Sequence, residues 1–96
     1  MKTYVILTTL TEEGKKKIQN NPEKTKLSAE SVAHRGGEIV EQFALLGPYD
    51  FLTIIRVKEE KAIYRIASEM GAMGTVKTMT LPAITIDAFI NDIKGE

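Results

Sequence analysis

Three side chains in this sequence are candidate groups for moving a proton in catalysis: Tyr49, Asp50 and His34. Tyr49 and Asp50 are adjacent in the run Gly47-Pro48-Tyr49-Asp50, and a phenol beside a carboxylate can bind or relay a proton at the mouth of a cavity. The same run is typical of a turn in which the carboxylate accepts backbone amides and the tyrosine packs. His34 can act as a base, or it can complement the dipole at a helix end. The turn and the helix end are the favoured interpretations, and all three residues stay candidate catalytic residues.

A second group of candidates consists of polar side chains within apolar, strand-like segments: Thr53, Lys77, Thr78 and Thr80. On a sheet face that packs against helices, such hydroxyl and ammonium groups can line a ligand cavity. Threonine is also a common strand residue that needs no role in binding. We therefore predict these four positions as candidate ligand-binding residues and keep the structural alternative open.

Metal and cofactor chemistry finds little support in the sequence. Cysteine is absent, which excludes a disulfide, a thiolate nucleophile and a zinc–cysteine site. With a single histidine, a zinc site would have to rely on carboxylates. The glycine-bearing run 71–74 lacks the following Lys-Ser/Thr of a phosphate-binding loop. No metal and no cofactor are predicted.

Composition limits the class of protein. The chain has 96 residues, which is the size of one domain, 1–96. Lys plus Arg and Asp plus Glu number 13 each, so there is none of the basic excess expected of a nucleic-acid binder. No run approaches the ~20 apolar residues of a membrane span. We expect a soluble, cytoplasmic protein that binds neither nucleic acid nor membrane.

The hydrophobic pattern predicts an α+β domain. Turn chemistry at 47–50 joins two of the strands as an antiparallel hairpin, and Pro82 is expected to end the last strand. Predicted strands are 4–7, 38–46, 51–57 and 76–81. One predicted helix begins at Thr11, and the others cover 23–34, 62–70 and a C-terminal segment at about 84–94. This order is the ferredoxin-like βαββαβ arrangement, with a four-stranded antiparallel sheet.

Both faces of the predicted sheet are apolar. In the third strand Phe51 and Ile55 point one way while Leu52 and Ile54 point the other, and strict alternation along 38–46 is expected. Leaving such side chains in water forfeits about 1.5–3 kcal/mol each. We therefore predict a homodimer or higher homo-oligomer in which two sheets pack face to face. The alternative is that the C-terminal tail covers the second face of its own subunit.

Four motifs resemble those of the GYD-domain family. The turn 47–50 is similar to its Gly-x-Tyr-Asp signature, 10–14 to its strand-to-helix opening, 36–40 to its glycine-led second strand, and 74–81 to its closing Gly-x-Val-x-Thr-x-Thr-Leu strand. The resemblance covers residues 4 to about 83 in the correct order. It implies the dimeric α+β barrel group, which includes effector-binding domains and cofactor-free oxygenases, and it leaves the biochemical role open.

Three functions from different classes remain, of which the third is a purely structural assembly unit. The first is a small-molecule-binding or regulatory module, a dimer that holds a small apolar ligand or a partner protein. The alternative is a cofactor-independent oxygenase or isomerase in which Tyr49, Asp50 or His34 handles a proton beside an apolar cavity. The sequence leaves the identity of the ligand, and whether the protein is an enzyme, undetermined.

Overall fold

The chain folds as one antiparallel sheet covered on one side by helices, as seen in a computed structural model that describes residues 1–25 and 29–95. The strand order is β2-β3-β1-β4, which is the order of a ferredoxin-like βαββαβ domain and confirms the predicted fold class. The strands are β1 (Lys2–Leu10), β2 (Gly37–Ala44), β3 (Phe51–Val57) and β4 (Val76–Ala83).

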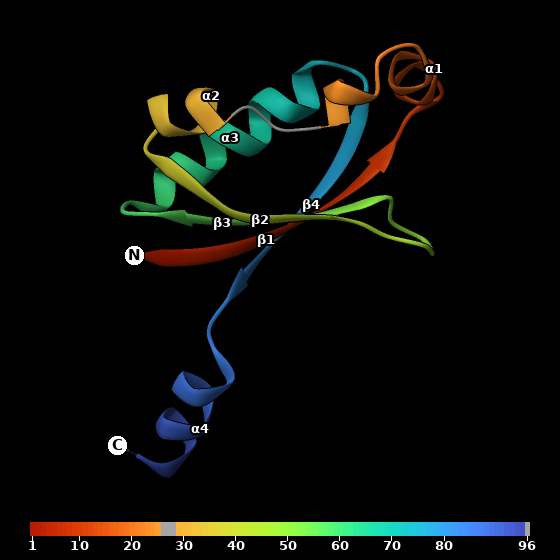
Figure 1. Cartoon of the computed structure of the whole chain (residues 1–96). Coiled ribbons are helices and arrows are strands. Elements are labelled where there is room, and N and C mark those ends of the chain that lie inside the picture. The colour runs from red at the N-terminus through yellow and green to blue at the C-terminus, as the bar shows by residue number, and fades with distance from the viewer. Residues whose placement is uncertain (26–28, 96) are drawn as a thin grey trace.

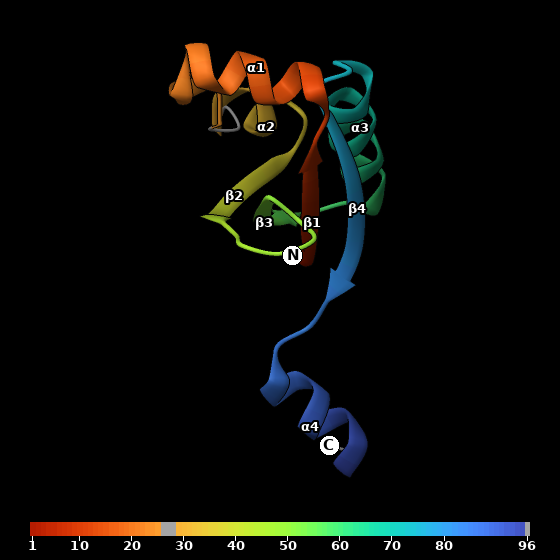
Figure 2. The same cartoon turned by 90° about the vertical axis from the view of Figure 1, so that its right-hand side faces the viewer.

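Three of the helices lie on one side of the sheet, and the fourth projects away from it (Figures 1 and 2). The helices are α1 (Glu12–Asn20), α2 (Ala29–His34), α3 (Glu60–Ala72) and α4 (Ile86–Lys94), with a 3₁₀ turn η1 at Pro22–Thr25. The helix predicted over 23–34 is therefore a 3₁₀ turn and a short α-helix, and its residues 26–28 lie outside the described residues.

The start of α1 is fixed to the start of β4. Thr11 is the N-cap, and its Oγ1 accepts a hydrogen bond from the Gly14 amide at 3.1 Å and donates one to the Gly74 carbonyl at 2.9 Å. Gly14 is buried, and a Cβ there would lie 2.0 Å from the Thr75 carbonyl oxygen. Only glycine lets the first turn of α1 approach this backbone so closely.

The core lies between the helices and the sheet face that they cover, which we call the inner face. Alternation along β1 and β3 places the side chains of Tyr4, Ile6, Ile55 and Val57 on this face. They pack against the apolar stripe of α3, whose spacing is that of an amphipathic helix. The buried residues from the helices are Val32, Ala62, Ile63, Ile66 and Met70.

Two sequence expectations about the edge strands are wrong. Ile39 pairs with Ile55 but Glu41 pairs with Ile54, so Val40 is an extra residue and strict alternation fails at this register shift. In β4 the strand does not end before Pro82, which lies opposite Tyr4. β4 is an edge strand, where proline can leave its missing amide on the unpaired side.

The opposite sheet face, which we call the outer face, is uncovered, and it is apolar at its centre with Glu41, Arg56 and Lys77 around it. Its side chains are half-buried at the centre and exposed toward the edge strands, with Phe43 47% and Met79 46% exposed. The register places on this face Val5, Leu7, Phe43, Leu52, Ile54, Met79 and Leu81. The predicted apolar character of both faces is therefore present in the structure.

Helix α4 does not cover the outer face of its own chain. All nine of its residues, each of them described, are exposed. Because α4 projects from the sheet, the radius of gyration is 14.6 Å, against about 12.5 Å for a compact domain of this length. The alternative prediction, that the C-terminal tail covers the outer face of its own subunit, is therefore wrong. Within the described residues, no helix is long and apolar enough to cross a membrane.

Candidate functional site

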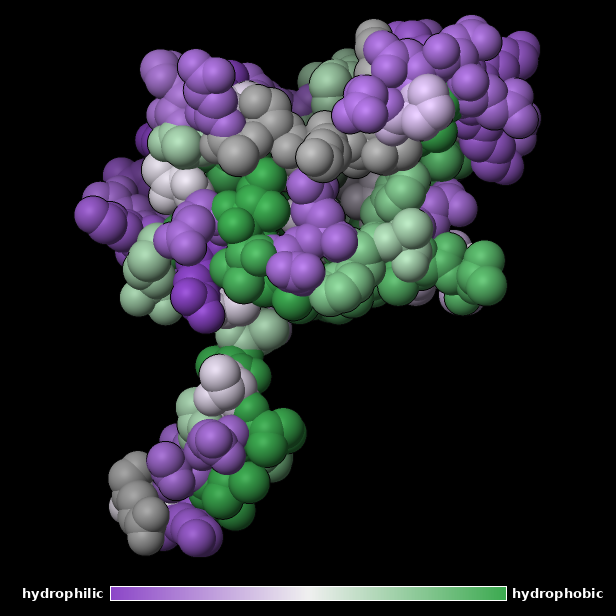
Figure 3. Space-filling model, in the orientation of Figure 1, coloured by the Kyte–Doolittle hydropathy of each residue, from purple (hydrophilic) through white to green (hydrophobic). Residues whose placement is uncertain are grey.

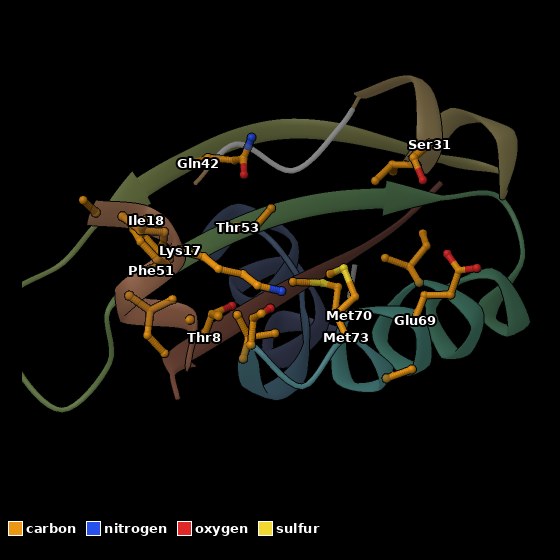
Figure 4. A pocket seen from close by; sticks show the side chains of 18 of the residues that line it. Thr8, Lys17, Ile18, Ser31, Gln42, Phe51, Thr53, Glu69, Met70 and Met73 are labelled. Carbon is orange, nitrogen blue, oxygen red and sulfur yellow. The ribbon is translucent and has the colours of Figure 1, made fainter. Parts of the chain in front are cut away.

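A cavity of about 1080 Å³ lies between the inner face and helices α1, α2 and α3 (Figure 4). Its floor includes Thr8, Phe51 and Thr53, and α3 contributes Ile66 and Met70 to its wall. The lining is mainly apolar with a few polar groups, which is the usual make-up of a small-molecule site.

The two hydroxyls of the floor are placed by strand register. Thr8 pairs with Phe51, and Ile6 pairs with Thr53, so both threonines lie on the inner face among apolar neighbours. Each threonine is only 3% exposed. The Oγ1 atom of Thr8 has no hydrogen-bond partner among the residues that the structure describes. A buried hydroxyl without a partner is uncommon in a folded protein and calls for an explanation.

Charged side chains from α1, from α3 and from the end of α2 border the cavity. Arg35 forms an ion pair with Glu69 on α3 and donates to the Ser31 carbonyl at 3.1 Å. Lys17 of α1 is 50% exposed and lies 3.5 Å from the Glu13 carboxylate on the same helix. Both cations have a carboxylate partner, but Arg35 is less exposed and has a second acceptor, so Lys17 is the freer of the two to meet an anion.

The predicted ligand-binding residues are not gathered in one site. Thr53 lines the large cavity, whereas Thr80 lines a smaller pocket of about 340 Å³ beside Tyr4. Thr78 lies on the inner face opposite Thr8. Lys77 pairs with Thr9 and is exposed on the outer face, so it does not reach the cavity. The role of these four residues in binding stays a prediction.

The candidate catalytic residues point to different places. Asp50 Oδ2 accepts a hydrogen bond from the Leu10 amide at 2.7 Å, and the Tyr49 hydroxyl donates to Met79 Sδ at 3.8 Å. His34 is exposed at the end of α2. Asp50 contacts the C-terminal end of β1. His34 precedes β2, and β2 begins beside the N-terminal end of β1, at the opposite end of the sheet. The structure therefore does not bring the three residues into one site.

Sequence reasoning missed the two groups that give the large cavity its chemistry, Thr8 and Lys17. Lys17 belongs to a run of three lysines that is typical of a solvated helix face. Thr8 could have been found, because in a strand every second side chain points to the same face, and positions 4, 6 and 8 therefore place Thr8 on the side of the apolar residues Tyr4 and Ile6. A hydroxyl in that series is a polar group placed into the core side of the sheet.

The fold and the site together define a class: a small ferredoxin-like α+β domain with a largely apolar cavity. Within the described part of the chain, no three histidine, aspartate or glutamate residues are grouped as metal ligands would be. The GYD domain matches residues 4–92, and the chain belongs to this family, as the four motifs suggested.

One protein of similar sequence comes from Thermus thermophilus. It is called glutamine synthetase and cystathionine beta-lyase binding protein, and it is 36% identical over 95 residues, which cover 98% of this chain and 100% of the relative. The two chains are therefore similar along their whole lengths.

Solved structures support the fold alone. The protein called FFRP-DM1 has a TM-score of 0.59 at 17% identity, covering 88% of this chain and 100% of that one. The protein TTHA0845, also from Thermus thermophilus, has a TM-score of 0.60 at 20% identity, with coverages of 88% and 95%. At this level of sequence identity, the similarity concerns the fold of the backbone only.

Proposed function

We propose that this chain is a binding and regulatory module that pairs with a second copy of itself and holds a partner protein. The observation that carries the proposal is that one chain leaves two apolar surfaces uncovered. The first is the outer face. The second is the α4 stripe, which we define as Ile86, Phe89, Ile90 and Ile93, between 41% and 70% exposed. Figure 3 displays the hydrophobic side of α4 and its hydrophilic opposite side.

The outer face is large for a surface that stays in water. Four strands of about eight residues, spaced about 4.8 Å apart with a rise of about 3.4 Å per residue, give roughly 500 Å². The apolar part is smaller, because the same face also carries Glu41, Arg56 and Lys77, and it falls among the largest apolar patches of soluble monomers, which are often functional. The α4 stripe adds to it. An exposed surface of this size favours an interface over a free monomer.

A second copy is the occupant that the geometry favours. Two sheets can pack face to face about 10 Å apart with their side chains interdigitated. A two-fold pair needs only one self-complementary patch, and the apolar residues at the centre of the outer face can supply it. Helix α4 is joined to β4 by Ile84 and Thr85 alone and points away from its own sheet (Figure 1). Its stripe is therefore available to the partner copy rather than to its own chain.

The partner protein is proposed from the relative. The Thermus thermophilus protein is named for binding two enzymes, and the likeness to it extends over nearly the whole of this chain. The separation of Tyr49, Asp50 and His34 gives no support to the enzyme alternative. A module that binds an enzyme needs no catalytic group of its own, which agrees with this arrangement.

The experiment is a titration of this protein, carrying a fluorescent label, with purified glutamine synthetase and with purified cystathionine beta-lyase from the same organism. We expect saturable binding of at least one enzyme with a Kd at or below about 10 μM, and competition by unlabelled protein. Failure of both enzymes to bind in this range would overturn the partner part of the proposal. It would leave self-association to be judged separately.

A further inference from the structure

The Thr8 hydroxyl is a polar group on the cavity floor that the described part of the chain leaves without a partner. Thr8 is 3% exposed, and its Oγ1 meets no donor or acceptor among these residues. The backbone role of this residue does not need the hydroxyl, because it is the Thr8 carbonyl that accepts the Asp50 amide at 2.8 Å. Valine has almost the same shape and would fill the position without burying a polar group. The Oγ1 atom is itself buried as placed, so a molecule in the cavity can accept its hydrogen bond only after rotation about the Cα–Cβ bond turns the hydroxyl toward the cavity.

Lys17 supplies a cation to the same cavity. Figure 4 shows its side chain extended from α1 into the space between the helices and the sheet, and it lines the same cavity as Thr8. Its contact with Glu13 at 3.5 Å is an exposed ion pair within one helix, and such pairs hold a lysine weakly. The Lys17 ammonium can therefore leave the Glu13 carboxylate and bind an anion inside the cavity.

The rest of the lining is mainly apolar and favours an apolar body, and its further polar residues are Ser31, Arg35, Gln42, Glu69 and Thr75. Phe51 and Thr53 form the floor beside Thr8, and Ile66, Met70 and Val76 add apolar side chains. A volume of about 1080 Å³ is at the upper end of the range for small-molecule sites. A hydroxyl and one ammonium suit a single carboxylate at one end of such a molecule, since both donate hydrogen bonds to oxygen.

We propose that this cavity binds a small monocarboxylate with an apolar body, whose carboxylate accepts hydrogen bonds from the Thr8 hydroxyl and the Lys17 ammonium. The site goes beyond the proposed function, because it lies on the helix side of the sheet and the self-association surface lies on the other side. Ligand binding and subunit pairing can therefore be tested separately on the same protein.

The first test compares octanoate with octanol by isothermal titration calorimetry on the full chain. The two probes share an apolar body and differ in the carboxylate. We expect one octanoate bound per chain and weaker binding of octanol. In Lys17→Gln, octanoate should bind about 5–10-fold more weakly, as expected for the loss of one partly exposed charge-assisted hydrogen bond, while octanol binding stays unchanged.

The second test uses Thr8→Val, which separates a binding role from a structural one. We expect octanoate affinity to fall about 5–10-fold, as for the loss of one hydrogen bond to a charged group. The thermal midpoint without ligand should stay the same or rise, because a buried hydroxyl that the fold does not use has been removed. A structural role for the hydroxyl would instead lower the midpoint.

The matched control is Met79→Gln, which changes the outer face and leaves the cavity lining intact. Octanoate binding should be unchanged in this variant. Three outcomes would overturn the proposal: no octanoate binding at millimolar concentration, equal octanoate affinity in the parent, Lys17→Gln and Thr8→Val, or loss of binding in Met79→Gln. The last result would place octanoate on the outer face.

Discussion

Asp50 holds the end of β1 through its side chain: Oδ2 accepts a hydrogen bond from the Leu10 amide at 2.7 Å across 40 residues of sequence. The backbone of Asp50 extends the same connection, because its amide donates to the Thr8 carbonyl and its carbonyl accepts from the Leu45 amide, both at 2.8 Å. The aspartate of the Gly-x-Tyr-Asp turn thus ties the β2–β3 hairpin to the neighbouring strand. This arrangement favours the turn interpretation of Asp50 over a catalytic one.

Asp50→Ala should therefore destabilise the fold. Removing the carboxylate leaves the half-buried Leu10 amide without its acceptor, at a cost of about 1.5–3 kcal/mol for a hydrogen bond to a charged group. Asp50→Asn keeps a neutral acceptor oxygen and should lose less. Urea denaturation of both variants and the parent measures the change. Equal midpoints for all three proteins would refute the structural role of this side chain.

Gly14→Ala should be strongly destabilising. The added Cβ would lie 2.0 Å from the Thr75 carbonyl oxygen, which is backbone and cannot turn aside. We expect a loss of about 1–3 kcal/mol or more in the free energy of unfolding, as for overpacking in a core. The measurement is again denaturant unfolding.

Gly71→Ala is the matched control for that substitution. Gly71 lies inside α3, and a Cβ there would meet nothing within 4 Å. Because alanine is the better helix former, this change should stabilise the protein by up to about 1 kcal/mol. If Gly14→Ala behaved like Gly71→Ala, the close packing of α1 on the start of β4 would be wrong.

Charge placed on the α4 stripe should weaken self-association without unfolding the domain. Phe89 and Ile90 are 50% and 41% exposed in the single chain, so Phe89→Asp and Ile90→Asp cost the monomer little. In the assembly each would bury a charge, and we expect a loss of affinity of at least about tenfold. Sedimentation velocity over a concentration series detects it. Asn91→Gln, on the polar side of the same helix, should behave as the parent does.

Leu81→Asp should weaken self-association through the outer face. Leu81 is 41% exposed on an edge strand, which allows the folded monomer to tolerate the charge. We expect a smaller species in sedimentation with an unchanged far-ultraviolet circular dichroism spectrum. Ser68→Asp, exposed on α3 at the helix side, should leave the assembly intact. A Leu81→Asp protein as large as the parent would argue against pairing through this face.

Much of the fold was readable from the sequence because its signals are local. The 3.6-residue spacing around Ile63 and Ile66 predicted α3, and the turn before Phe51 predicted the hairpin. The bulge at Val40 and the continuation of β4 through Pro82 were not readable. Both depend on a strand's position at a sheet edge, where an extra residue or a missing amide is tolerated. Edge position is a property of the assembled sheet.

The candidate site was less accessible to sequence reasoning. Tyr49 and Asp50 are neighbours in sequence, yet their side chains reach Met79 and Leu10 respectively. Adjacent residues at the end of a strand point to opposite sides, so proximity in sequence did not imply a shared site. Lys17 and Thr8 line the same cavity because α1 packs over the sheet, which no spacing rule in the sequence encodes.

Sedimentation equilibrium of the unmodified protein at micromolar concentration tests self-association most directly. The uncovered apolar sheet surface and the projecting helix predict a mass of twice 10.7 kDa or a larger multiple of it. A folded species that stays at 10.7 kDa over the whole concentration range would contradict this view of the protein.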